Sequence, residues 1–286
     1  MGVVMIDVNT YVALAQNDSI DNAEQYRLSN SPKKLFKFMP FYDSGNLAVN
    51  KRNIETIEEN KIWASKYSTL NDPFEFKSIY LDEDKIRKSG NSVETFEKYL
   101  DYINNSFLVV SFSAEGNIHP LNNMPMWAYY SNNHHGICIE YEVVNPIILY
   151  PIIYETTRNQ IASIIGNFVY LATAAAKGEI PPDDADLKLY QFLMINNLCR
   201  KHKSWQHENE YRILVPNVDK ILHGKRVLLN QIGVKIKAIY LGRDCSTRNK
   251  KNLYHTSQKL GIDIFQMDIK NKSNDFEMEY KPYMKN

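Results

Sequence analysis

Short apolar runs towards both ends of the chain predict strands, and two longer segments in the middle predict helices. The predicted strands cover residues 35–39, 61–64, 107–113, 137–141, 147–154, 211–215, 226–229, 234–241 and 262–267. The predicted helices cover residues 53–60, 92–105, 126–130, 157–176, 183–203 and the segment between Ser246 and Gly261. Strand-rich ends around a helical middle predict one α+β domain.

The predicted domain spans residues 35–270, with a helical insertion at about residues 156–203. Residues 1–34 show weak periodicity and many Asn and Asp side chains, so we interpret them as an N-terminal extension of uncertain order. Residues 271–286 are interpreted as a C-terminal tail. The pattern shows no internal repeat and no low-complexity linker, which favours a single domain.

The composition is that of an ordinary folded protein. Of the 286 residues, 44% are hydrophobic, which is too many for an intrinsically disordered chain. Lys and Arg number 34 against 33 Asp and Glu, so the formal net charge is +1. General coating of nucleic acid requires a basic excess, because phosphate neutralisation supplies most of that affinity. The charge therefore argues against a broad nucleic-acid-binding surface and leaves a local basic groove open.

The cysteines and the apolar runs bear on the compartment. Cys138, Cys199 and Cys245 are odd in number and far apart, which fits neither a disulfide framework nor a C-x-x-C pair. The first residues lack the basic segment of a signal peptide. The longest uncharged run, residues 160–176, is shorter than the roughly 20 residues of a membrane span. We expect a reduced, cytoplasmic protein with no membrane partner.

Two groups of carboxylates are candidates for chemistry. Glu208 and Glu210 lead into a predicted strand, where alternation places both on one side and raises the pKa of one of them. The competing interpretation, that Glu210 pairs with Arg212 on a solvated face, has about equal weight. Asp72 and Glu75 could hold a metal ion or act as a base, but an Asx-turn before Pro73 is the favoured interpretation of that segment.

An aromatic segment follows Pro125. Trp127, Tyr129 and Tyr130 precede His134, and such side chains suit a stacked planar ligand such as a nucleobase or a nicotinamide ring. The alternative is a helix that buries Trp127 and Tyr130. Adjacent His134 and His135 diverge on any regular element, so we expect no zinc site there.

Four blocks of residues, in order, resemble a bacterial family, the domain of unknown function 2971. The resemblance spans roughly residues 35 to 270. It rests on Leu35-Phe36-Lys37-Phe38, Trp63-Ala64-Ser65 with Asn71-Asp72-Pro73-Phe74-Glu75, a block through Met126, Trp127, Tyr130, His134, Gly136, Cys138, Glu140 and Tyr141, and a final block of Trp205, Glu208, Glu210, Tyr211 and Arg212. It implies no established chemistry.

A second, more distant resemblance is to the ADP-ribosyltransferase superfamily. It implies a strand-rich core with Lys37 in the place of a basic strand residue, Ser111 and Ser113 in a Ser-x-Ser strand, and a catalytic Glu-x-Glu. In that chemistry Glu210 would stabilise an oxocarbenium-like transition state, and Glu208 would position or deprotonate the acceptor. Lys37 departs from the superfamily's usual Arg or His, and Phe112 replaces a Thr.

This second resemblance implies that NAD is the substrate. The binding residues would be Lys37, Ser111, Ser113, Trp127, Tyr129, Tyr130 and His134, with Glu208 and Glu210 catalytic and no metal. The expected activity is modification of a macromolecule, protein or nucleic acid, by a bacterial toxin or phage-defence effector that works with other defence-system proteins. Glu210→Gln is expected to abolish catalysis with little change in melting temperature.

Two alternatives stay open. One is a metal-dependent nuclease in which Asp72, Glu75, His134 and Glu210 converge on a divalent ion. The other is a non-catalytic sensor or adaptor that binds a nucleotide or a partner protein through its aromatic pocket.

Overall fold

The computed structural model describes residues 6–159 and 163–284 and shows an α+β protein. The helices are α1 Val8–Asn17, α2 Ile20–Ser29, α3 Leu47–Glu58, α4 Glu83–Lys88, α5 Val93–Asn105, α6 Met124–Tyr130, α7 Ser163–Ala176, α8 Ala185–Leu198 and α9 Thr247–Leu260. The strands are β1 Lys34–Met39, β2 Lys61–Lys66, β3 Phe107–Ala114, β4 Ile137–Val143, β5 Leu149–Pro151, β6 Ile153–Glu155, β7 Arg200–His202, β8 Glu210–Pro216, β9 Gly224–Leu228, β10 Val234–Leu241, β11 Asp263–Ile269 and β12 Met278–Pro282.

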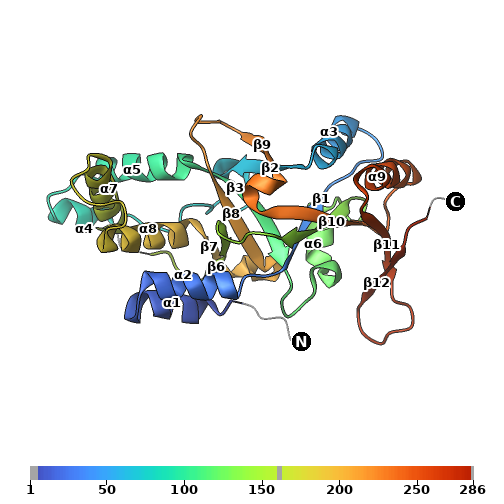
Figure 1. Cartoon of the computed structure of the whole chain (residues 1–286), viewed down its shortest axis with the longest axis horizontal. Coiled ribbons are helices and arrows are strands. Elements are labelled where there is room, and N and C mark those ends of the chain that lie inside the picture. The colour runs from blue at the N-terminus through green and yellow to red at the C-terminus, as the bar shows by residue number, and fades with distance from the viewer. Residues whose placement is uncertain (1–5, 160–162, 285–286) are drawn as a thin grey trace.

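One large mixed sheet runs through the molecule in the order β12-β11-β10-β4-β1-β3-β2-β9, and β8 and β5 join it through β3. Helices α4, α5, α7 and α8 gather at one end of the sheet, and α9, β11 and β12 form the other end (Figure 1). Strands β6 and β7 pair in parallel outside the large sheet.

The sheet forks at β3. Strand β8 pairs with β3 along its full length, from Phe107↔Pro216 to Ser113↔Glu210. On the other edge of β3, β1 pairs only with Ser113 and Ala114, and β2 pairs only with Leu108 and Val109. The edge of β3 between these two short pairings therefore has no strand beside it, and backbone groups without a ladder partner need another partner there.

The two faces of the sheet carry different cores. Alternate residues of β3, Leu108, Val110 and Phe112, belong to the main apolar cluster on one face. Val109 on the opposite face belongs to a second cluster, which includes residues of α5, α7 and α8. A third cluster, around Trp127 of α6, includes Phe36 and Phe38 of β1. The apolar packing on this second face is thus divided between two clusters.

Strong local signals were read correctly from the sequence. Ser92 caps α5, and α9 lies between its N-cap Ser246 and the left-handed Gly261, as predicted. The strand predicted at residues 234–241 coincides with β10. The helix predicted at residues 53–60 is the second half of α3, which begins at Leu47. Part of the helix predicted at residues 157–176, residues 160–162, lies outside the described residues.

Other predictions differ from the structure because contacts between distant segments decide them. The predicted helix at residues 183–203 ends at Leu198, and the chain then enters β7, where Lys201 pairs with Tyr154 of β6. The predicted C-terminal tail contains β12, which pairs with β11. Residues 6–34, predicted to be of uncertain order, form α1 and α2, and Tyr11 and Ala23 are buried in the main apolar cluster.

Arg27 anchors the N-terminal helices to the sheet. Its side chain is 1% exposed, and its Nη1 donates to the carbonyl oxygens of Leu149 at 2.6 Å and Pro146 at 3.0 Å. Nη2 donates to Ile147 at 3.0 Å, and the guanidinium lies 4.4 Å from the ring centre of Tyr150. One arginine thus satisfies the carbonyls of the turn that leads into β5.

No described helix is both long enough and apolar enough to cross a membrane.

We expect Arg27→Met to lower the free energy of unfolding by about 3 kcal/mol, because it leaves three carbonyl oxygens without a donor. Urea unfolding followed by circular dichroism measures the change. Arg52→Met, at an exposed position of α3, is the matched control and should change stability by about 0.5 kcal/mol or less. Equal effects of the two substitutions would show that Arg27 is not an anchor.

Candidate functional site

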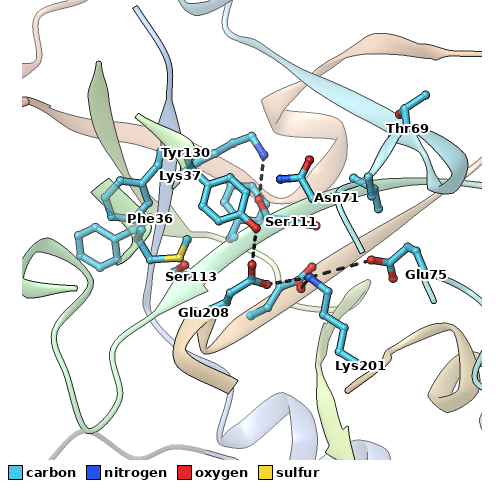
Figure 2. A pocket seen from close by; sticks show the side chains of 15 residues that line it. Phe36, Lys37, Thr69, Asn71, Glu75, Ser111, Ser113, Tyr130, Lys201 and Glu208 are labelled. Atoms are coloured by element: carbon cyan, nitrogen blue, oxygen red, sulfur yellow. Dashed lines mark hydrogen bonds and ion pairs between the residues drawn. The ribbon is translucent and has the colours of Figure 1, made fainter. Parts of the chain in front are cut away.

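A cavity of about 240 Å³ opens beside the fork in the sheet. Its walls come from β1, β3, α6, the segment that follows β2, and the chain around β7 and β8 (Figure 2). The lining residues are Phe36, Lys37, Phe38, Thr69, Leu70, Asn71, Glu75, Ser111, Phe112, Ser113, Met126, Tyr130, Lys201, Glu208 and Glu210. Residues far apart in the sequence therefore meet at the place where β1 and β2 leave β3.

Lys37 fills part of the gap at the fork. Its Nζ donates to the backbone carbonyl oxygen of Ser111 at 2.9 Å, on the stretch of β3 that has neither β1 nor β2 beside it. The ammonium also lies 5.8 Å from the ring centre of Phe112. Burial lowers the pKa of Lys37 to about 8, because the surroundings disfavour the charged form. Lys37 is therefore a cation that titrates at this edge of the cavity.

Glu208 and Glu210 meet at the cavity, as predicted, but for a different reason. Glu208 ends a 3₁₀ helix at Lys203–Glu208, and only Glu210 lies in β8. Between them Asn209 has a left-handed backbone (φ 41°), and its Nδ2 donates to the carbonyls of Ala114 and Glu115. Asn tolerates this conformation better than most residues. The turn at Asn209, rather than strand alternation, brings the carboxylates together.

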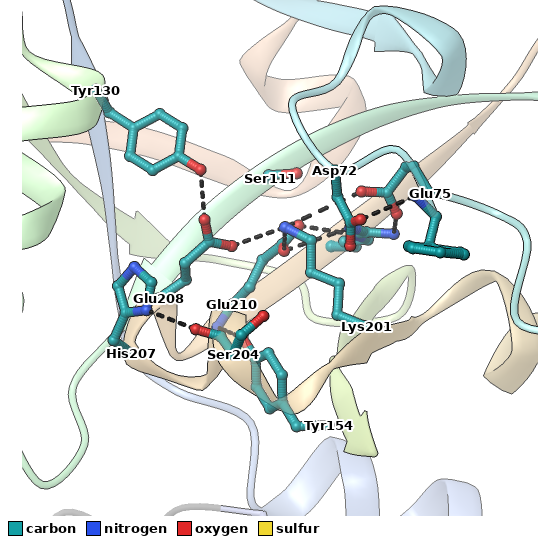
Figure 3. A network of polar contacts seen from close by, with 12 residues as sticks. Asp72, Glu75, Ser111, Tyr130, Tyr154, Lys201, Ser204, His207, Glu208 and Glu210 are labelled. Carbon is teal, nitrogen blue, oxygen red and sulfur yellow. Dashed lines mark hydrogen bonds and ion pairs between the residues drawn. The ribbon is translucent and has the colours of Figure 1, made fainter. Parts of the chain in front are cut away.

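Lys201 joins the two carboxylates. Its Nζ lies 2.7 Å from Glu208 and 2.8 Å from Glu210, and 4.0 Å from Glu75 (Figure 3). Burial opposes the charged form of Lys201, but Glu210 and Glu208 outweigh this and hold its pKa above the ordinary value. The phenol of Tyr130 donates to Glu208 in a very short hydrogen bond.

Arg212 is the fully buried cation that pairs with two carboxylates of the cluster. Its side chain is fully buried, and it reaches Glu210 through Nε at 2.7 Å and Glu75 through Nη1 at 2.5 Å. Nη1 also donates to the carbonyl of Leu198 at the end of α8. The predicted pairing of Glu210 with Arg212 is confirmed, but it lies in the interior and not on the solvated face that was expected.

This cluster contains more carboxylates than cations. Glu75, Glu208 and Glu210 face two cations, Lys201 and Arg212, so full ionisation would leave one surplus negative charge in a buried site. Burial and the neighbouring Glu210 raise the pKa of both Glu75 and Glu208, although their cation partners partly offset this. For Glu210, burial also favours protonation, but Arg212 and Lys201 prevail and hold its pKa well below the usual range. A proton taken up by the cluster therefore goes to Glu75 or Glu208 in preference to Glu210.

The segment around Asp72 forms the Asx-turn that the sequence favours. Asp72 Oδ1 accepts a hydrogen bond from the backbone N–H of Phe74 at 2.9 Å. Its Oδ2 is buried and has no hydrogen-bond partner among the described residues. Across the described ranges, no group of three or more His, Cys, Asp or Glu side chains is placed to hold a metal ion. The guanidinium of Arg212 stands between Glu75 and Glu210, where the nuclease hypothesis requires an ion.

Three predicted binding residues lie away from this cavity. Trp127 is fully buried in the third apolar cluster, and its Nε1 donates to the carbonyl of Leu121. His134 stacks on Trp127 with ring centres 5.9 Å apart. Tyr129 is 68% exposed and contacts His207. The structure thus brings together Lys37, Ser111, Ser113, Tyr130, Glu208 and Glu210.

The sequence interpretation missed Lys201. It lies in β7, within a stretch predicted to be helical, and no local pattern distinguishes it from a surface lysine. Its place follows from the pairing of β7 with β6, a contact between segments about 45 residues apart. Glu75 was considered only as a metal ligand or a base, and its partner Arg212 only as a partner of Glu210.

The segment from α6 to β8 matches a known family. Residues 126–213 match the family described as Protein of unknown function (DUF2971), which supports the family resemblance of the sequence over that segment. The match includes Tyr130, Lys201, Glu208 and Glu210, and it ends within β8. No curated protein and no solved structure was found to match the chain. None of these comparisons names an activity.

We expect Arg212→Met to lower the free energy of unfolding by about 3–5 kcal/mol, because it leaves Glu75 and Glu210 buried without their shared cation. Glu75→Gln removes the surplus negative charge instead, and should cost about 1 kcal/mol or less. Urea unfolding at neutral pH compares the two. A Glu75→Gln variant as unstable as Arg212→Met would contradict the surplus of negative charge.

We expect the stability of Lys37→Met relative to the wild type to fall by about 1–3 kcal/mol as the pH rises from 8 to 10, on top of a pH-independent cost for the carbonyl oxygen of Ser111, which loses its donor. With its folded-state pKa near 8 and an unfolded value of about 10.4, Lys37 releases its proton earlier in the folded state, so its unfavourable contribution disappears across that window. Thermal melts at several pH values measure the difference. The exposed Lys251→Met is the control, and a difference for Lys37→Met that does not change with pH would contradict the burial of a charge.

Proposed function

We propose that this protein is an NAD-dependent, ADP-ribosyltransferase-like enzyme that modifies a macromolecule. The observation that carries the proposal is a cluster of three buried carboxylates, Glu75, Glu208 and Glu210, at the wall of this cavity, which pairs with only two cations, Lys201 and Arg212, among the described residues. Such a site favours a ligand whose positive charge grows as the reaction proceeds. Preorganised charge in a site shielded from water is among the strongest sources of transition-state stabilisation.

NAD meets this electrostatic requirement. Its nicotinamide ring carries a positive charge when bonded to ribose, and the ribose C1′ becomes oxocarbenium-like as that bond breaks. Phe36, Phe38 and Met126 supply apolar walls beside the polar floor, and Tyr130 supplies an aromatic ring. The cavity is smaller than the roughly 300–1,000 Å³ of most ligand pockets, so it accommodates one end of the dinucleotide.

In this proposal Glu210 and Glu208 have different roles in the reaction. Glu210, kept ionised by Arg212 and Lys201, faces the developing charge at C1′. The C1′–N bond breaks and its electron pair leaves with neutral nicotinamide. The acceptor then forms the new bond to C1′, and the proton that it loses passes to the carboxylate of Glu208, whose pKa is raised. Ser111, Ser113 and Lys37 supply further hydrogen-bonding groups in the cavity wall.

The biological setting belongs to the same proposal. An enzyme that transfers ADP-ribose to a macromolecule suits a bacterial toxin or a phage-defence effector, with other defence proteins as its regulators. The support for this setting is the family resemblance alone, and the chemistry can be tested without it.

The structure changes the expectation for Glu210→Gln. Because Glu210 pairs with both Arg212 and Lys201 in the interior, its loss leaves these cations short of an acceptor, and the melting temperature should fall. Activity must therefore be compared well below the melting temperature of each variant. Glu140→Gln is the control, because Glu140 is also buried and also pairs with a lysine, Lys34, outside the cavity, while its second partner is the phenol of Tyr240.

We expect the wild type to release nicotinamide from labelled NAD and to label a protein, RNA or DNA acceptor. Glu210→Gln should lower both rates by about 100-fold or more, because it removes the charge that faces C1′. Glu208→Gln should lower transfer more than nicotinamide release, because it affects the acceptor's proton. Glu140→Gln should retain both activities. No NAD binding, no nicotinamide release and no labelled acceptor with the folded wild type would refute the proposal.

A further inference from the structure

A second cavity, of about 480 Å³, lies on the other side of Lys201. Its walls come from the turn after Asp72, the chain that follows β6, and the segment from β7 into the 3₁₀ helix at Lys203–Glu208. The lining residues are Asp72, Pro73, Phe74, Lys77, Ser78, Glu155, Thr156, Thr157, Arg158, Arg200, Lys201, His202, Ser204 and Trp205. Lys201 is the lining residue that this second cavity shares with the first.

The rim of the second cavity is basic. Lys77 is exposed, and no ion pair with an acidic side chain is found for it in the described part of the chain. Arg158 donates to the backbone carbonyls of Lys77 and Ile79 and lies 5.5 Å from the ring centre of Tyr80, and no acidic side chain among the described residues pairs with it. Arg200 pairs with Glu155. This local excess of cations, on a protein with almost no net charge, suits a phosphate group.

The same cavity carries exposed aromatic surface. Phe74 is 55% exposed and lines the cavity, although apolar rings of this size are usually buried. Trp205 lines it too, and its ring centre lies 5.3 Å from the ammonium of Lys201. Aromatic rings beside cations that bind phosphates are the combination that stacks single-stranded bases, because every base has a π face.

Asp72 supplies an independent indication of the ligand. Its side chain is 5% exposed, its Oδ2 has no hydrogen-bond partner in the described chain, and it lines the second cavity. A buried carboxylate oxygen without a donor is costly. An amino group or a ring N–H on the edge of a nucleobase provides the missing donor. A phosphate cannot do so, because it carries no donor and would repel the carboxylate.

From these observations we propose that the second cavity binds one nucleotide of a single-stranded nucleic acid, with its base against Phe74 and Trp205 and its phosphate at Lys77 and Arg158. The inference deepens the proposed function and, in naming the acceptor, rests on it. In the transfer, a base or sugar nucleophile of that strand bonds to C1′ of NAD, nicotinamide leaves with the electron pair, and Glu208 takes the nucleophile's proton. A duplex presents a base to this cavity only after that base has unpaired and flipped out, which costs a few kcal/mol.

The test measures binding of fluorescein-labelled single strands of about eight nucleotides, one DNA and one RNA, by anisotropy without NAD. At about 50 mM salt, Phe74→Ala should weaken binding about 10-fold through lost stacking, and Lys77→Gln about 5-fold through a lost phosphate contact. Tyr170→Ala and Lys251→Gln are matched controls at exposed positions outside the cavity, and should change affinity by about two-fold or less. A duplex of the same sequence should bind about 10-fold more weakly than the single strand.

No saturable binding of either strand would overturn the inference. So would binding that Phe74→Ala and Lys77→Gln weaken no more than the two controls do, or binding of the duplex as tightly as of the single strand. These outcomes are separate from the NAD experiment. A protein that releases nicotinamide but binds no strand would keep the proposed function and lose this acceptor site. A protein that binds strands through Phe74 and Lys77 but never turns over NAD would keep the binding site and lose the chemistry.

Discussion

The ion pairs of Arg212 determine the form of the site. A fully buried guanidinium is tolerated only where its surroundings compensate its charge, and here Glu75, Glu210 and the carbonyl of Leu198 do so. These three partners come from the turn after β2, the start of β8 and the end of α8. Arg212 therefore fixes three segments relative to one another. The turn after β2 and the start of β8 carry Glu75 and Glu210, which line the first cavity, and the chain that follows α8 carries Lys201, which lines it too.

The fork of the sheet creates the cavity that the charged side chains line. If β1 paired with β3 along its whole length, the carbonyl of Ser111 would accept a ladder hydrogen bond from β1 and no cavity could open beside it. The fork leaves that carbonyl to the ammonium of Lys37 and divides the apolar packing between two clusters. The polar site stays open because the apolar side chains of neither cluster cover it.

The sequence predicts the fold better than the site. Ser246, Gly261 and the apolar runs of β3 and β10 are local signals, and their elements lie where the pattern places them. The convergence of Glu208 and Glu210 could be predicted because the two residues are close in sequence. The position of Lys201 could not, because a lysine in a short strand takes its role from a distant partner. For Trp127 the sequence left ligand stacking and burial in a helix both open, and its packing with distant residues shows burial. Aromatic character alone does not distinguish a ring that packs in a core from one that binds a ligand.

Lys201 links the two cavities in one electrostatic system. Its ammonium contacts Glu208 and Glu210 on one side and faces the ring of Trp205 on the other. Because the acidic cluster already has fewer cations than carboxylates, any shift of this ammonium towards the second cavity increases the negative charge that the first cavity presents. A ligand that engages Trp205 or Lys201 therefore changes the charge balance around Glu210 without touching it. In a transferase, such a connection makes the stabilisation of positive charge at C1′ depend on whether an acceptor is in place.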